Sequence, residues 1–203
     1  MSAAMKPILF STPMVQAILD GRKTMTRRVV KNIKNDFDYS VTINNIDDSI
    51  SKKIIGEIPK YQVGDVLWVR ETWCKAIMDR GTAQEKEIFL YRADEGREWT
   101  QPNDGFNIQW KPSIFMPKEY ARIFLRVTNV RVERLQDISV EDILKEGAPL
   151  ITITGNNEDF INSKLKGWWY DLWNSINGKG SWEANPYVFV YTFQRVEKPK
   201  EMK

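Results

Sequence analysis

The segment GRKTMTRR, residues 21–28, places four basic side chains and two hydroxyls within eight residues. In it, Lys23 precedes Thr26 by three positions. A threonine hydroxyl is a weak nucleophile, but a lysine whose pKa is lowered by burial or by nearby positive charge can accept its proton. The segment itself supplies such charge through Arg22, Arg27 and Arg28. It therefore has the groups for nucleophilic catalysis, and an exposed cationic turn is the simpler alternative.

The spacing of this pair sets a geometric condition on the chemistry. Side chains three positions apart point to opposite faces of an extended strand. Lys23 and Thr26 can therefore act together only if the backbone turns or bulges between them. A catalytic role predicts such a bend, with both side chains facing one cleft.

The composition narrows the chemistry that any site can use. The 203 residues include no histidine and one cysteine, Cys74. These counts exclude Ser-His-Asp and Cys-His catalysis, histidine-ligated metals, internal disulfides and cysteine zinc clusters. Hydrolysis must then use lysine, hydroxyl, phenol and carboxylate groups, and we expect no metal and no cofactor. A net charge of +3 is weak support for an anionic partner.

The first residues of the sequence and the lengths of its apolar runs indicate the expected location of the protein in the cell. The first ten residues lack a charged region followed by a long apolar run, as a signal peptide would have. No apolar run approaches the length that crosses a membrane. We therefore expect a cytoplasmic protein without a membrane partner.

The elements around the basic segment begin with a helix. Ser11 or Thr12 can cap it, Pro13 suits its first turn, and Gly21 ends it. The basic segment thus follows a helix C-terminus. Residues 31–60 are polar and predict an insertion or a long loop.

The clearest predicted strand spans residues 121–135. Apolar residues alternate at odd positions up to Val127 and at even positions from Val130. This change of parity predicts a bulge or bend near Thr128–Asn129. Kinks of this kind help a sheet to close into a barrel.

The remaining elements complete an α+β order. Ser139, with Asp142 three residues later, predicts a capped helix that Gly147 stops. An apolar stripe rich in tryptophan predicts a longer core-facing helix over residues 158–176. Further strands are expected at residues 66–71, 86–93 and 187–196. This order favours a small barrel with helices packed on it.

Taken in this order, the motifs resemble the ASCH domain of the PUA-like superfamily. The resemblance is carried by the GRKT-x-T turn, the GD-V-L-x-V strand, the long strand ending in VRVERLQDIS-x-ED, and the closing YVFVYTFQRV strand. The W-N-S-I-N-G-K-G-S-W-x-x-N-P segment is similar to larger members found in phages. The resemblance implies a PUA-like β-barrel with flanking helices, in a single domain over residues 7–196. Insertions are expected at about 31–60 and 75–118, and a charged tail at 197–203.

The resemblance also implies an activity. Small bacterial members are amidohydrolases that remove the acyl group from N(4)-acetylcytidine, with a lysine as proton acceptor, a threonine as nucleophile and a glutamate as proton donor. These roles map onto Lys23, Thr26 and Glu146. The implied substrate is an acylated cytosine nucleoside. Other members are described as RNA-binding proteins or ribonucleases, so RNA is the alternative partner.

Two carboxylates compete for the role of proton donor. Glu146 is expected in the last turn of its helix, where the negative end of the dipole disfavours the charged form and so suits a proton donor. Glu71, on the strand beside Arg70, is the rival. The candidates for substrate binding are Arg22, Arg28, Trp68 and Glu71. Among them, Trp68 offers a face on which a pyrimidine can stack, although core filling is the simpler role.

Overall fold

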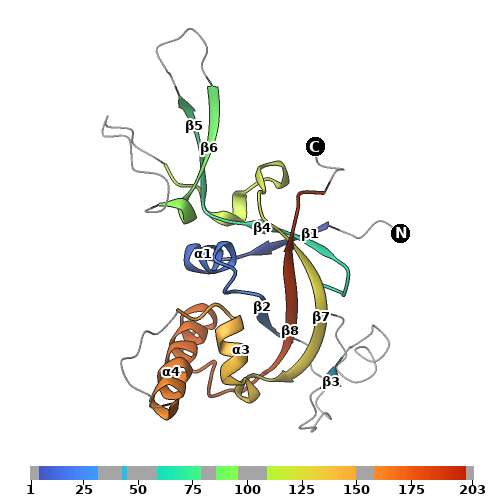
Figure 1. Ribbon diagram of the computed structural model, residues 1–203, viewed down its shortest axis with the longest axis vertical. Helices are drawn as coiled ribbons and strands as arrows, with labels where there is room; N and C mark the ends of the chain where they lie inside the picture. Colours follow the sequence, from blue (N-terminus) through green and yellow to red (C-terminus); the bar gives the residue numbers. More distant parts are fainter. Residues whose placement is uncertain are drawn as a thin grey trace.

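The computed structural model describes residues 5–31, 43–44, 59–78, 86–95, 109–149 and 158–199 of the chain. These residues form a six-stranded sheet, a separate two-stranded hairpin, and helices that pack beside the sheet. Figure 1 shows the hairpin at one end of the molecule and the helices α3 and α4 at the other. The expected α+β class is confirmed.

The main sheet has the strand order β1-β4-β7-β8-β2, and β3 pairs with β7. Its strands are β1 (Met5–Leu9), β2 (Met25–Val29), β3 (Ile43–Asn44), β4 (Val66–Arg70), β7 (Phe124–Arg134) and β8 (Tyr187–Val196). Only β1 and β4 are parallel, and the other pairs are antiparallel. Among the described strands, β1 and β2 end this order without pairing to each other. The sheet is therefore open, and the closed barrel expected from the sequence is not formed.

The change of parity in the long strand is confirmed as a register shift. The pairing of β7 with β8 slips between Val127 and Asn129. The extra residue turns the apolar positions on both sides of the slip toward the same core, so that both Val127 and Val130 are buried.

In the described part of the chain, three α-helices pack beside the sheet. They are α1 (Thr12–Leu19), α3 (Val140–Lys145) and α4 (Glu158–Asn177). Ser139 caps α3 as predicted, because its hydroxyl accepts a hydrogen bond from the Asp142 amide at 3.1 Å. The α4 helix packs with α3 and buries Trp169 and Trp173 in a core shared with β8. None of the helices in the described ranges combines the length and apolar character needed to cross a bilayer.

The region expected as a second insertion contains a hairpin. It consists of β5 (Trp73–Met78) and β6 (Lys86–Tyr91). Single turns of 3-10 helix lie after β6, before β7 and after β7, at Arg92–Asp94, Ser113–Phe115, Lys118–Tyr120 and Leu135–Asp137. Most of the expected insertion at 31–60, and the tail from residue 200, lie outside the described residues.

Candidate active site

A cavity of about 800 Å³ opens between the sheet, the turn after β1 and the helix α4. Its lining includes Lys23, Thr26, Arg28 and Glu146. The volume falls within the roughly 300–1,000 Å³ that small-molecule sites occupy. The cavity thus gathers the three residues expected to act in catalysis.

The backbone of the basic segment bends as a catalytic role requires. Gly21 has a φ of 74°, and the amides of Arg22 and Lys23 both donate to the Ala17 carbonyl at 2.9 Å. Lys23 then forms an isolated antiparallel bridge with Glu146, and the regular strand β2 begins only at Met25. Because the segment is not one continuous strand, the side chains of Lys23 and Thr26 reach the same cavity.

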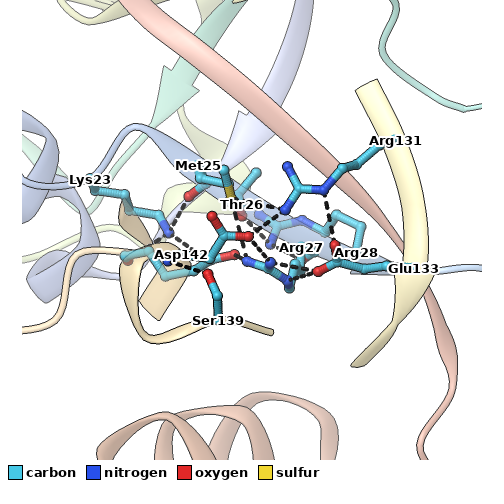
Figure 2. Close-up of polar contacts among 10 residues, drawn as sticks. Lys23, Met25, Thr26, Arg27, Arg28, Arg131, Glu133, Ser139 and Asp142 are labelled. Atoms are coloured by element: carbon cyan, nitrogen blue, oxygen red, sulfur yellow. Dashed lines mark hydrogen bonds and ion pairs between the residues drawn. The ribbon is translucent and has the colours of Figure 1, made fainter. Parts of the chain in front are cut away.

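The Lys23 ammonium is buried and fully hydrogen-bonded. It donates to the Glu146 Oε2 at 2.7 Å, to the Glu146 carbonyl at 2.9 Å and to the Met25 carbonyl at 2.8 Å. An ammonium has three donors, so each of them has an acceptor. Figure 2 shows the Lys23 side chain reaching the Met25 carbonyl. The side chain is held in one position from which it can exchange a proton with Glu146.

The surroundings of Lys23 lower its pKa. The largest cause is burial, which disfavours the charged ammonium. The Glu146 carboxylate opposes this effect, while the guanidinium groups of Arg28 and Arg27 lower the pKa further. Arg22 lies elsewhere, with its guanidinium donating to the Gly147 carbonyl at 2.7 Å and paired with Asp20. Two of the three arginines therefore act on Lys23 as expected.

Glu146 lies at the end of α3, where the helix stops and the bridge to Lys23 begins. It is the C-cap residue, and it is 2% exposed. Its Oε2 faces the Lys23 ammonium, and its Oε1 accepts from the Arg27 Nη1 at 3.1 Å. The expected helix-end position of this carboxylate is confirmed, and two cations hold it against the cavity.

Gly147 permits the close approach of the two site segments. Its φ is 97°, and a Cβ at this position would lie 2.8 Å from the Ala17 Cβ and 3.0 Å from the Lys23 Cβ. Gly178 has a φ of 96° but open space around it, so it provides a matched control. Gly147→Ala should therefore reduce the free energy of unfolding by about 1–3 kcal/mol more than Gly178→Ala, through overpacking alone. Urea denaturation of both variants measures the difference, and equal losses would contradict the role of close approach.

Arg27 is the centre of a buried ion-pair network that the sequence did not single out. Its guanidinium contacts three carboxylates, those of Glu133 at 2.6 Å, Asp142 at 2.6 Å and Glu146 at 3.1 Å. Arg131 pairs with the first two of these from the neighbouring part of β7. Burial alone would lower the pKa of Arg27, but the three carboxylates outweigh it and raise the pKa. Figure 2 shows Arg27 and Arg131 with Glu133 and Asp142 to the right of the Lys23 side chain.

Thr26 lies on β2 with its hydroxyl held by a neighbouring cation. The residue is 1% exposed and lies opposite Tyr191 in the pairing of β2 with β8. Its Oγ1 accepts from the Arg28 Nη1 at 2.9 Å. In the part of the chain that the structure describes, no hydrogen bond joins this hydroxyl directly to Lys23. The residues expected as nucleophile and base thus share the cavity without a direct hydrogen bond between them.

Comparison with protein-family models, with curated proteins and with solved structures finds no match for this chain. Across the described ranges, no group of three histidine, cysteine, aspartate or glutamate side chains is placed to hold a metal ion.

Two expected binding residues lie in a different part of the molecule. Trp68 is buried in a cluster with Trp73 and Met116, away from the cavity lining. Glu71 forms a two-point ion pair with Arg122, with both hydrogen bonds at 2.9 Å. Burial raises the pKa of Glu71, but the group does not reach Lys23. Of the two rival carboxylates, the structure therefore brings only Glu146 to the lysine.

Several cavity residues had no clear signal in the sequence. Trp169 and Trp173 belong to the helical stripe that was expected to fill the core, and they do so, but they also line the cavity. Tyr61 precedes β4 and packs edge-on against Tyr191, at 5.1 Å between ring centroids. Helical spacing indicates which residues face inward, yet it cannot tell a packed interior from the wall of a cavity.

Proposed function

We propose that the protein is an amidohydrolase that removes the acyl group from N(4)-acylated cytosine nucleosides, of the N(4)-acetylcytidine type. The observation that carries this proposal is that Lys23, Thr26 and Glu146 line one cavity, with the Lys23 ammonium 2.7 Å from the Glu146 carboxylate. The resemblance of the surrounding motifs to the ASCH domain, with its PUA-like fold, supplies the class of substrate.

In the proposed reaction, a proton first moves from the Lys23 ammonium to Glu146. Their contact at 2.7 Å is short enough for direct transfer. Both groups are almost completely buried, so the transfer removes two charges that are costly to keep out of water. It leaves a neutral amine that can act as a base and a carboxylic acid that can donate a proton.

The acyl-transfer step then follows. The Thr26 oxygen attacks the acyl carbonyl carbon while its proton passes to the Lys23 amine, and the carbonyl oxygen becomes an oxyanion. Arg28 donates to the Thr26 oxygen at 2.9 Å and so holds the hydroxyl in place before the attack. Collapse of the oxyanion breaks the bond between carbon and N4, and the departing nitrogen takes the proton from Glu146. The product is cytidine, with an ester on Thr26.

Water completes the turnover. The Glu146 carboxylate accepts a proton from the water that attacks the Thr26 ester, and the ester oxygen regains the proton held by Lys23. The acyl group leaves as a carboxylic acid, which ionises in solution. The proton on Glu146 then passes back to the Lys23 amine, which restores the starting forms of both side chains.

The two threonines of the basic segment provide the test of this proposal. Thr26 lines the cavity and Thr24 does not. Thr26→Val should reduce the release of cytidine from N(4)-acetylcytidine by at least about 100-fold, whereas Thr24→Val should retain most of the activity. Steady-state rates measured by chromatography give the comparison. Equal rates for the two variants would contradict the role of Thr26 as nucleophile.

RNA binding is the second candidate function, favoured by the cations that line the cavity. They include Arg28, Lys31 and Lys60. Binding of RNA would weaken steeply as salt rises, because neutralised phosphates release their counterions. An RNA-binding module would show this dependence without releasing cytidine from N(4)-acetylcytidine.

A further inference from the structure

Arg28 is a partly buried cation whose hydrogen-bond partners are neutral. Throughout the described ranges, no carboxylate lies within ion-pair distance of its guanidinium. Its partners are the Thr26 hydroxyl at 2.9 Å, the Arg27 carbonyl at 3.0 Å and the Leu9 carbonyl at 3.2 Å, which are all neutral. The nearby Glu146 carboxylate is already shared by Lys23 and Arg27. Removing a cation from water without a counter-charge costs free energy, so Arg28 is suited to receive an anion from a ligand.

Two tryptophans beside the same cavity also have donors without a hydrogen-bond partner among the described residues. Trp169 and Trp173 are each 3% exposed, and both line the cavity. In the described part of the chain, neither indole Nε1 has a hydrogen-bond partner. Buried donors in proteins normally have an acceptor. The two donors are thus buried beside the cavity without an acceptor.

Other groups on the lining reinforce this preference for an anionic ligand. The Lys60 ammonium lies 5.3 Å from the centre of the Tyr61 ring, at the side of the cavity that Tyr61 forms. Burial raises the pKa of both Tyr61 and Tyr191, so these phenols remain neutral. Glu146 is the one carboxylate among the lining residues that the structure describes, and it is neutralised within the site.

We propose that the cavity binds a phosphate monoester through Arg28 and Lys60, and that the substrate is an acylated cytidine monophosphate rather than the free nucleoside. The nucleoside part of this inference rests on the proposed function, whereas the anion site rests on the cavity alone. A monoester carries about −1.5 to −2 charges near pH 7 and several acceptor oxygens. A cavity of about 800 Å³ is of the size that holds one small ligand such as a nucleotide.

Calorimetric titration of the full chain tests the anion site without any turnover. At low salt, cytidine 5′-monophosphate should bind at least about tenfold more tightly than cytidine, as expected when charged hydrogen bonds are gained. The advantage should shrink as salt screens the charges. Arg28→Gln should abolish it, and Lys60→Ala should reduce it by about threefold. Lys166→Ala, an exposed α4 residue outside the cavity lining, is the charge-matched control and should leave it unchanged.

The outcomes separate the anion site from the proposed function. Equal affinities for cytidine and its monophosphate, or no loss of the advantage in Lys60→Ala and Arg28→Gln, would overturn the anion site. Tighter binding of a cytidine oligonucleotide without terminal phosphates would overturn it in favour of RNA. A clear monophosphate advantage in a protein that deacylates no cytosine compound would keep the anion site and reject the amidohydrolase. Deacylation of N(4)-acetylcytidine by a protein that binds the monophosphate no more tightly than cytidine would keep the amidohydrolase and reject the anion site.

Discussion

Replacing Lys23 with methionine should lower kcat for N(4)-acetylcytidine by about 10²–10⁴-fold, the range that a positioned proton-transfer group contributes. Methionine keeps most of the apolar stem in a position that is 3% exposed, and it removes the ammonium. Glu146 keeps its hydrogen bond from Arg27 at 3.1 Å, so its carboxylate retains one cationic partner. Steady-state kinetics, together with urea denaturation to show that the variant is folded, measure the effect.

Lys23→Arg separates chemistry from charge. A guanidinium keeps the positive charge and the donors but stays protonated at any practical pH, so it cannot act as a base. The arginine variant should therefore be about as inactive as the methionine variant. If Lys23 only held the two segments together, arginine would restore activity, and that result would contradict the proposed role.

The pH profile of the wild-type protein gives an independent check on the same role. Burial lowers the pKa of Lys23 from its ordinary value of 10.5. In the proposed reaction the Lys23 ammonium supplies the proton that Glu146 later gives to the departing nitrogen, so the resting pair must hold this proton. Above the lowered pKa of Lys23 the proton is lost, and kcat/KM should therefore fall as pH rises through that pKa, at a pH below 10.5. A profile that stays level up to pH 10.5, or rises through this range, would contradict the proposed proton transfer.

Replacing Arg27 with methionine should reduce the free energy of unfolding by about 3–5 kcal/mol, the usual result of removing one partner from a buried ion pair. The Arg27 side chain is fully buried, and it faces Glu133, Asp142 and Glu146. Without it, these carboxylates lose their shared cation. Arg131 then remains as a partner for Glu133 and Asp142 only.

Urea denaturation measures this loss against an exposed control. Arg126 lies on β7 and is exposed, so Arg126→Met should leave the free energy of unfolding within about 0.5 kcal/mol of the wild type. A loss of 3–5 kcal/mol is a large part of the roughly 5–15 kcal/mol that stabilises most domains. If Arg27→Met were no worse than the control, the network would not be a major contributor to stability.

The parts of the fold that follow from local patterns could be predicted from the sequence. Gly21 ends α1 and Ser139 caps α3, because capping depends on residues within one turn. The register shift near Asn129 was likewise visible, since alternation changes parity wherever a strand gains one residue. Closure of a barrel is different. It depends on whether two edge strands meet, and no local pattern reports that.

The candidate site could be predicted only in part, because its geometry also depends on contacts between distant parts of the chain. The three arginines of the basic segment have the same side chain but lie in three different environments. Arg22 caps carbonyls after α3, Arg27 lies among carboxylates, and Arg28 contacts only neutral oxygens. The difference is decided by residues distant in the chain, such as Glu133 on β7. The choice of Glu146 over Glu71 was also decided by tertiary contact, because both occur at the ends of regular elements.

The place of β2 in the sheet has a consequence for the time at which the site can form during synthesis. This strand carries Thr26, and among the described strands it pairs only with β8, which follows all the others in the chain. Domains fold as their residues emerge, the N-terminal part first. Thr26 is made early, but it stays without its strand partner until residues 187–196 have left the ribosome. A nascent or truncated chain that ends before β8 would therefore carry Lys23, Thr26 and Glu146 and still lack the candidate site.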